Sequence, residues 1–133
     1  HHSLFFANDW ITHFNEIFDN PQWPTAPSYY VNCPTKTDTS LAPDGCENIF
    51  IVVPVASDME DTAEVREEYA KKMIEDFEKN IGEEITSSIM VRRVFSQRDF
   101  KAMYHAYKGT SLGLSHTLMQ SSIFRPSHQS KKS

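Results

Sequence analysis

The chain has 133 residues, a mass of 15.3 kDa and a net charge of −5, which is enough for one modest domain. No apolar run approaches the roughly 20 residues that a membrane-spanning helix needs, and the first residues lack the features of a signal peptide, so a soluble, cytoplasmic protein is expected. Cys33 and Cys46 lack the spacing of metal ligands, which favours reduced thiols and predicts no metal site.

The charges are unevenly distributed along the chain. Residues 1–57 carry one lysine against six acidic residues, and residues 58–84 carry four basic against eleven acidic residues. Residues 85–133 carry eight basic residues against Asp99 alone. This basic final third predicts contact with an anion, such as a phosphate, a nucleotide or a membrane headgroup. Nucleic acid is not expected, because the basic residues are not interleaved with aromatic residues on a recognisable platform.

The first expected element is a short amphipathic helix. It begins after Asp9, which suits the N-cap position, and it ends at Asn20. Its apolar residues recur at helical spacing and fall on one face. These residues are Trp10, Phe14, Ile17 and Phe18.

Three segments have the composition of β-strands. Residues 28–36 are rich in aromatic and β-branched residues and predict a strand that stops at Pro34. Residues 48–57 form a continuous apolar run, which predicts a strand buried on both faces, with an edge or a bulge at Pro54. Residues 85–96 predict a third strand whose side chains alternate between two faces.

Two further helices are expected. One spans residues 62–81, with Asp61 as its cap and Gly82 after its end. Its apolar stripe consists of Tyr69, Ala70, Met73, Ile74, Phe77 and Ile81. The other begins after Ser96, reaches Gly109 and places on its inner face Phe100, Met103, Tyr104 and Tyr107. The fold class predicted is α+β, with a small mixed or antiparallel sheet and about three helices packed on it.

The sequence contains no motif for a complete catalytic or cofactor site, such as GxGxxG, a P-loop, HExxH or a nucleophile elbow. His13 and His105 are expected to be partly buried and hydrogen-bonded rather than ligands. His116 differs, because it stands four residues before Gln120 on a short helical segment after a glycine-punctuated turn. An apolar wall for a flat or apolar ligand is formed by Leu112, Leu114, Leu118, Met119, Ile123 and Phe124. A core helix explains the same pattern equally well.

Four stretches carry more information than these local patterns. In chain order they read HHSLFFANDWITHFNEIF, PSYYVNCPTKTDTSLAPDGCENIFIVVPVA, VFSQRDF and YHAYKGTSLGLSHTLMQSSIFRP. Together they resemble the phytoene dehydrogenase family of flavoproteins, also called carotenoid desaturases, over nearly the whole chain. The resemblance implies an FAD-dependent oxidoreductase that acts on a long apolar polyene or isoprenoid, in which the cofactor carries the chemistry and the protein positions the substrate.

The resemblance also implies that the chain is a substrate-side portion of such an enzyme. The GxGxxG element and the closing flavin motif of the family are not among these residues. Residues 1–126 are therefore expected to form a single substrate-side domain fragment, and residues 127–133 a tail that leads to the missing FAD-binding motif. FAD is expected in the full-length protein and not in this fragment, which is expected to be inactive alone. The implied partners are the polyene substrate, the FAD domain of the same chain and a peripheral membrane surface.

The same resemblance places residues 109–125 along the substrate tunnel, next to the flavin. The cofactor-binding residues that it implies are Gly109, Gly113 and Arg125. The substrate-binding residues that it implies are His116, Gln120, Leu112, Leu118 and Phe124.

The roles of other aromatic residues stay open at the level of the sequence. A hydrocarbon path and core packing both explain Trp10, Phe14, Tyr29, Tyr30 and Phe50. Membrane contact is a further role for Phe5, Phe6 and Trp10. The alternative to an enzyme is a non-enzymatic module of the same fold that binds an apolar ligand or another protein.

Overall fold

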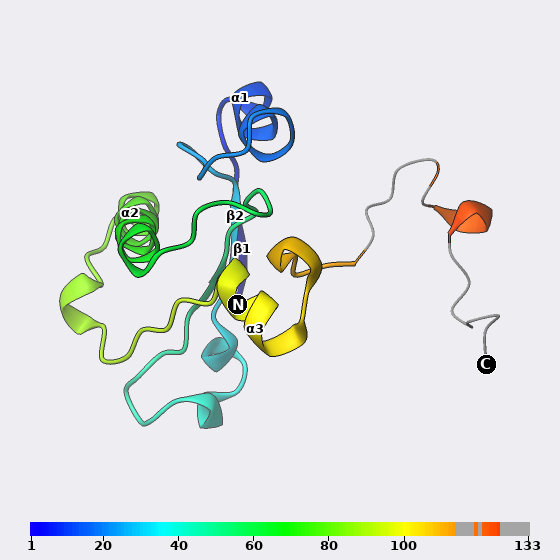
Figure 1. Cartoon of the computed structure of the whole chain (residues 1–133). Coiled ribbons are helices and arrows are strands. Elements are labelled where there is room, and N and C mark those ends of the chain that lie inside the picture. The colour runs from blue at the N-terminus through cyan, green and yellow to red at the C-terminus, as the bar shows by residue number, and fades with distance from the viewer. Residues whose placement is uncertain (114–118, 120, 126–133) are drawn as a thin grey trace, which may run out of the picture. The chain divides into compact units, whose positions relative to one another are not determined.

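The structure is a computed structural model that describes residues 1–113, 119 and 121–125. The chain divides into two units, residues 1–94 and residues 95–133 (Figure 1). The first unit contains a β-sheet and the helices α1 (Trp10–Phe14) and α2 (Ala63–Ile81), and the second contains the helix α3 (Gln97–Tyr104). The expected single domain over residues 1–126 stays a prediction.

In the part of the chain that the structure describes, three strands form one antiparallel sheet. They are β1 (His2–Phe5), β2 (Tyr29–Asn32) and β3 (Phe50–Val52), and β2 lies in the centre. The first two predicted strands are thus confirmed as β2 and β3, and β2 ends before Pro34 as expected. No sequence pattern predicts β1, because four residues give too short a run to recognise and its order comes from pairing with β2.

Strand β3 is an edge strand, as the proline after it suggests. The expectation that it is buried on both faces is wrong. Phe50 and Val52 are exposed, and Ile51 alone of the three packs against the core. A strand is buried on both faces only when other elements pack on both sides of the sheet. The apolar run does not indicate whether such elements are present on both sides.

Helix α2 (Ala63–Ile81) covers one face of the sheet (Figure 1). Met73 and Phe77 on α2 pack with Tyr29 and Val31 of β2 to form the core. Phe5 completes it, because its ring stacks on Tyr29 at 4.8 Å and meets the Phe77 ring edge-on at 5.8 Å. The apolar stripe predicted for this helix is confirmed at these buried positions.

The ends of α2 follow from local chemistry. Gly82 ends the helix in the left-handed conformation at φ +73°, as predicted. The N-cap is Thr62, whose hydroxyl accepts a hydrogen bond from the Val65 N–H at 3.2 Å. The prediction of Asp61 as the cap is therefore wrong by one residue, because its carboxylate forms a partly buried ion pair with Arg66 instead.

Helix α1 (Trp10–Phe14) continues into a π-helical turn (Asn15–Asp19). Asp9 caps α1 as predicted, since its carboxylate accepts hydrogen bonds from the Thr12 N–H at 3.0 Å and the Thr12 hydroxyl at 2.7 Å. Of the roles left open for its aromatic residues, core packing is not observed for Trp10 and Phe14. Its aromatic residues are exposed, and the residues that it buries are His13 and Glu16.

Residues 85–96 do not form the predicted strand. Thr86–Ser88 is a 3-10 turn, and the residues that follow up to α3 have no regular structure. The Glu78 carboxylate accepts hydrogen bonds from the backbone N–H groups of Ile85 and Thr86 at 2.8 and 2.6 Å. At the start of this segment a side chain thus binds two backbone N–H groups that a strand would have paired.

The second unit contains α3 (Gln97–Tyr104), which Ser96 caps as the sequence predicts, in a capping box with Asp99. The helix ends at His105, which adopts a left-handed conformation at φ +52°, and not at Gly109. The predicted inner face is wrong for three of its residues, which are exposed in the structure: Met103, Tyr104 and Tyr107. Phe100 instead meets Phe95 edge-on at 4.7 Å.

The α+β fold class is confirmed by the antiparallel sheet and its accompanying helices. Among the described residues, no helix is long and apolar enough to cross a membrane.

Candidate functional site

The face of the sheet opposite α2 presents an apolar surface. The register aligns Leu4, Tyr30 and Val52 in one cross-strand row, and aligns His2, Asn32 and Phe50 in the next. Side chains alternate along a strand, so these residues point away from the core formed with α2. Leu4 is 63 % exposed and Phe50 is 60 % exposed. We call this set of six residues the open face.

The open face also carries polar groups. The His2 ring nitrogen Nδ1 lies 2.5 Å from the Tyr30 hydroxyl. The Oδ1 atom of Asn32 is buried and accepts no hydrogen bond from the described residues. A buried acceptor without a donor costs free energy, so this amide is a polar group at the border of the open face that the described residues leave unsatisfied. An apolar surface with a few polar groups is the usual chemistry of a site for an apolar ligand.

A row of aromatic side chains begins just after β1 and runs along α1 and the π turn. Its first member, Phe6, directly follows the last residue of β1. The centroids of successive rings are 5.5, 6.0 and 5.9 Å apart in the order Phe6, Trp10, Phe14, Phe18. All four side chains are substantially exposed. We call these four residues the aromatic row.

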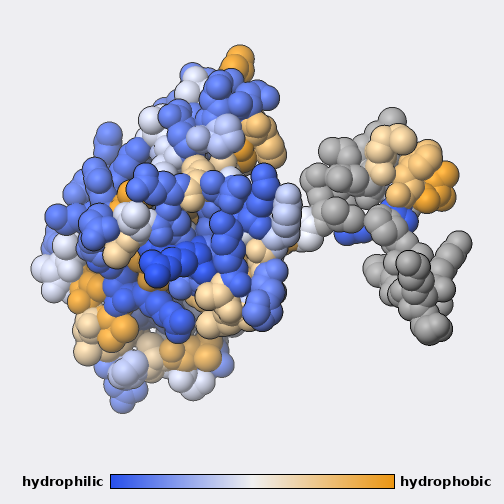
Figure 2. Space-filling model, in the orientation of Figure 1, coloured by the Kyte–Doolittle hydropathy of each residue, from blue (hydrophilic) through white to orange (hydrophobic). Residues whose placement is uncertain are grey.

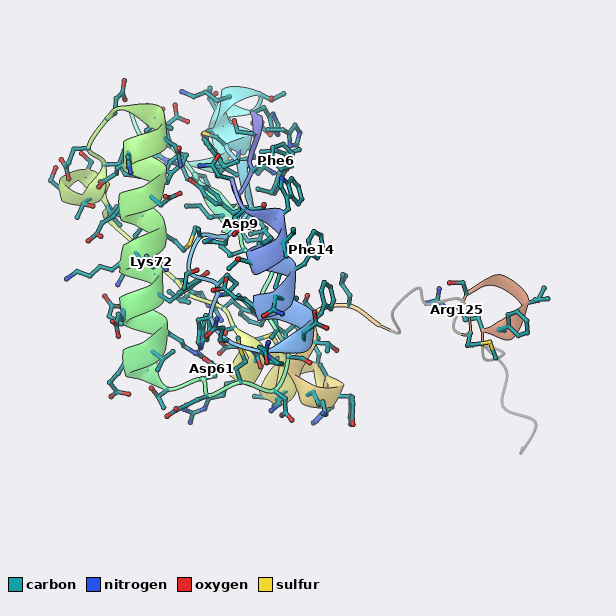
Figure 3. The ribbon with its side chains drawn as sticks, turned by 90° about the horizontal axis from the view of Figure 1, so that it is seen from above. Phe6, Asp9, Phe14, Asp61, Lys72 and Arg125 are labelled. Carbon is teal, nitrogen blue, oxygen red and sulfur yellow. The ribbon has the colours of Figure 1, made fainter. Side chains whose placement is uncertain are left out.

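The aromatic row points away from α2, as Phe6 and Phe14 show in Figure 3. Hydrophobic residues are visible on the molecular surface beside α1 in Figure 2. The helix therefore presents its apolar side to solvent.

Glu16 holds the other side of this helix in place. Its carboxylate accepts hydrogen bonds from the Thr25 hydroxyl at 2.7 Å, the Thr25 N–H at 3.0 Å and the Gln22 amide at 3.1 Å. Glu16 is 3 % exposed, so these bonds replace the water that burial removes. These hydrogen bonds hold the proline-rich segment that follows the π turn against Glu16.

His13 is the second buried polar residue of α1. It is 4 % exposed, and its Nδ1 atom has no hydrogen-bond partner among the described residues. The expectation of a hydrogen-bonded histidine is therefore wrong for this atom. His105 is exposed, which corrects the expectation that it is partly buried.

The predicted cofactor residues lie in the second unit. Gly109 is buried at φ +70°, and a Cβ atom added there would come within 2.6 Å of the Gln97 backbone. Packing against α3 therefore explains why this position is glycine, and a role toward a flavin stays a prediction. Gly113 has open space around it, and Arg125 is exposed, so both are accessible to a ligand.

The predicted substrate residues fall partly within the described chain. Leu112 and Phe124 are exposed, at 81 % and 53 %. The other three lie outside the described residues: His116, Leu118 and Gln120. All five assignments stay predictions.

Two other kinds of site are less suitable. A shallow hollow of about 290 Å³ is lined by Trp23, Val65 and the residues 21–22 and 58–60, but it includes no predicted site residue and exposes two carboxylates. Within the described ranges, no group of three or more His, Cys, Asp or Glu side chains is arranged to hold a metal ion. Both cysteines are free thiols.

Sequence reasoning missed Leu4 and Val52, which the sheet register brings beside Tyr30. The signal available for them is the alternation of His2, Leu4 and Phe6 at a spacing of two residues. That alternation is recognisable as a strand face only once β1 is known to pair with β2.

Comparison with known proteins shows which proteins this chain is similar to in sequence. No family model matches the chain. The chain does match curated carotenoid and phytoene desaturases over nearly all of its own length, which confirms the resemblance seen in the sequence. It corresponds to a segment of these oxidoreductases and spans about a quarter of their length.

Three relatives illustrate the match. A carotenoid 3,4-desaturase of Haloarcula japonica is 44 % identical over 130 residues, which is 98 % of this chain and 26 % of the relative. A zeta-carotene-forming phytoene desaturase of Myxococcus xanthus is 34 % identical over 97 % of this chain and 25 % of its own length. A 4,4'-diapophytoene desaturase of Staphylococcus aureus is 33 % identical over 98 % of this chain and 27 % of its own length.

Proposed function

We propose that this chain is the substrate-side segment of an FAD-dependent carotenoid desaturase, and that its open face forms part of the wall along which a long apolar polyene lies. The observation that supports this most directly is the uncovered apolar face of the sheet, in a chain whose relatives are named for polyene substrates. Burial of a ligand against an apolar surface has no preferred direction. In sites of this kind a few polar groups usually fix the orientation of the ligand.

The residues of the open face have separate tasks in this proposal. Leu4, Val52 and Phe50 exclude water from the hydrocarbon chain. The Tyr30 hydroxyl, hydrogen-bonded to His2, and the side chain of Asn32 border the apolar surface.

The flavin side is proposed for the second unit. Gly113 and Arg125 are the accessible residues of the predicted cofactor set, and Arg125 supplies a permanent positive charge for a phosphate. Gly109 fits this role less well on its Cβ side, because Gln97 already occupies that space. The chemistry that FAD supplies when bound is acceptance of hydride from the polyene.

The experiment uses the full-length natural protein that carries this segment. The absorption spectrum tests for bound flavin, and conversion of phytoene in detergent micelles tests for desaturation. Leu4→Glu and Val52→Glu place a charge on the open face and are expected to lower turnover by about tenfold or more while the flavin spectrum is unchanged. Lys71→Glu, at an exposed position of α2, is the matched control and is expected to keep full turnover.

A full-length protein that neither binds FAD nor converts phytoene would contradict the proposal. Normal turnover in Leu4→Glu and Val52→Glu would remove the open face from the substrate wall. A peripheral membrane contact is a separate expectation for the same protein and is tested by sedimentation with phospholipid vesicles.

A further inference from the structure

The connection between β2 and β3 contains an exposed turn at residues 43–46, with the dipeptide Asp44-Gly45 in its middle. The Cys46 N–H donates a hydrogen bond to the Pro43 carbonyl oxygen at 2.9 Å and closes the turn. Gly45 adopts φ +76°, and no atom lies within 4 Å of the position that a Cβ would take. Of the four glycines of the chain, Gly45 is the one that follows an aspartate or an asparagine. Because glycine has no side chain, Gly45 does not shield its own backbone nitrogen from the neighbouring carboxylate.

The Asp44 carboxylate differs from other exposed carboxylates in the first unit. Within the described part of the chain it accepts no hydrogen bond, and the Gly45 N–H donates none. The Asp9 carboxylate, in contrast, accepts a hydrogen bond from the Thr12 N–H at 3.0 Å. The Asp38 carboxylate accepts hydrogen bonds from the Ser40 N–H at 3.0 Å and the Ser40 hydroxyl at 2.6 Å. These local bonds hold the side chains of Asp9 and Asp38 in place, whereas the Asp44 side chain is able to rotate toward the next peptide nitrogen.

We infer that Asp44 is a site of spontaneous covalent modification, at which the aspartate isomerises to isoaspartate through a succinimide. In the first step the Gly45 backbone nitrogen attacks the side-chain carboxyl carbon of Asp44. The new N–C bond closes a five-membered ring, and the carboxyl hydroxyl and the amide proton leave as water. In the second step water opens the ring at either carbonyl carbon. Opening at the side-chain carbonyl restores aspartate, while opening at the main-chain carbonyl gives isoaspartate, with no change in oxidation state.

Isoaspartate at this position changes the backbone close to the hydrogen bonds that join the two sides of the connection. The Glu47 carboxylate accepts hydrogen bonds from the Thr35 hydroxyl and the Lys36 ammonium group. The Asn48 N–H donates a hydrogen bond to the Thr35 hydroxyl oxygen at 3.3 Å. Isoaspartate routes the main chain through the side-chain carbons and so lengthens the turn by one carbon atom. The longer turn displaces Glu47 relative to Thr35, so these hydrogen bonds weaken in the modified protein.

The test uses the full-length natural protein, incubated in buffer near neutral pH for several weeks. Peptide mapping by mass spectrometry with electron-transfer fragmentation distinguishes isoaspartate from aspartate at each position. Methyl transfer from S-adenosylmethionine by an isoaspartyl methyltransferase measures the total. Isoaspartate is expected to form at Asp44 at least about tenfold faster than at Asp9 or Asp38, because hydrogen bonds hold those two carboxylates away from the next peptide nitrogen.

Two variants serve as matched controls. Asp44→Glu keeps the charge but must close a six-membered ring, and it is expected to abolish the modified product at this position. Gly45→Asn is tolerated at positive φ better than most substitutions and adds a side chain beside the attacking nitrogen, so it is expected to slow the reaction several-fold. Hydrogen exchange of the Asn48 amide is expected to be faster in the incubated wild type than in incubated Asp44→Glu. Circular dichroism before incubation establishes that both variants are folded.

A synthetic peptide of residues 40–49, incubated in parallel, reports the reaction without the fold. Isoaspartate in the peptide but not at Asp44 of the folded protein would overturn the inference, because the turn would then protect the dipeptide. Equal rates at Asp44 and Asp38 would overturn it as well, since local hydrogen bonding would not select the site. The reaction requires neither a flavin nor a polyene, so its outcome is independent of the proposed function.

Discussion

Helices α1 and α2 belong to the same unit and have similarly clear amphipathic sequences, yet they use their apolar sides in opposite ways. Met73 and Phe77 of α2 are buried against the sheet. Trp10 and Phe14 of α1 stack on each other in solvent. An amphipathic pattern therefore identifies which residues share a side of a helix, but not whether that side meets the core or a ligand.

The largest expected difference between the two helices is in stability. Phe77→Ala removes a core ring that contacts Phe5, and it is expected to lower the free energy of unfolding by about 3–5 kcal/mol. Phe14→Ala removes a ring of the same size from an exposed position and is expected to change stability by about 0.5 kcal/mol or less. Urea unfolding followed by circular dichroism measures both. Similar losses in the two variants would show that α1 is covered in solution.

A second difference concerns the polar interior under α1. Glu16→Ala leaves the N–H and hydroxyl groups of Thr25 and the Gln22 amide without their acceptor, and it is expected to cost about 1–3 kcal/mol. The control is Glu75→Ala at an exposed position of α2, which is expected to be nearly neutral. Equal unfolding midpoints for the two variants would mean that the Glu16 hydrogen bonds do not hold the helix.

Much of the fold was predictable because it depends on local chemistry. The caps at Asp9 and Ser96 and the left-handed Gly82 each depend on residues within a few positions of one another. The local sequence is therefore enough to predict them. Strand β2 was equally clear because a proline ends it. The predicted strand over residues 85–96 is wrong, and at its start Glu78, from an earlier helix, binds two backbone N–H groups that a strand would have used.

The candidate site was predictable only in part, for a different reason. The open face requires the register of three strands, and β1 is not recognisable alone. The sequence did select Trp10, Phe14, Tyr30 and Phe50 as residues for a hydrocarbon path or for the core, and the structure leaves them on the accessible side. Tyr29, chosen with them, lies in the core, because it alternates with Tyr30 along β2.

The N-cap of α2 offers a smaller and more local comparison with α1. Thr62→Ala removes the hydroxyl that binds the Val65 N–H and is expected to cost about 1 kcal/mol. Thr62→Ser keeps the hydroxyl and is expected to retain most of the stability. Thermal unfolding of the two variants tests whether Thr62 or the adjacent Asp61 caps the helix. Equal losses would contradict the assignment of Thr62 as the cap.

The cap of α1, unlike that of α2, is itself an ionisable group, so the two helices are expected to respond differently to acid. Hydrogen bonds from the Thr12 hydroxyl and then the Thr12 N–H lower the pKa of Asp9 below its ordinary value of 3.8. A lowered pKa in the folded state means that the stabilising effect is fully present above pH 3.8 and is lost as the pH falls through the folded pKa. The Thr62 hydroxyl does not ionise and keeps its hydrogen bond across this range.

The amide chemical shift of Thr12, followed by NMR, is therefore expected to titrate with a midpoint below 3.8, and Asp9→Asn is expected to abolish that transition. A midpoint at or above 3.8 would show that Asp9 does not hold its cap in solution, and the first turn of α1 would then depend on the Glu16 hydrogen bonds alone.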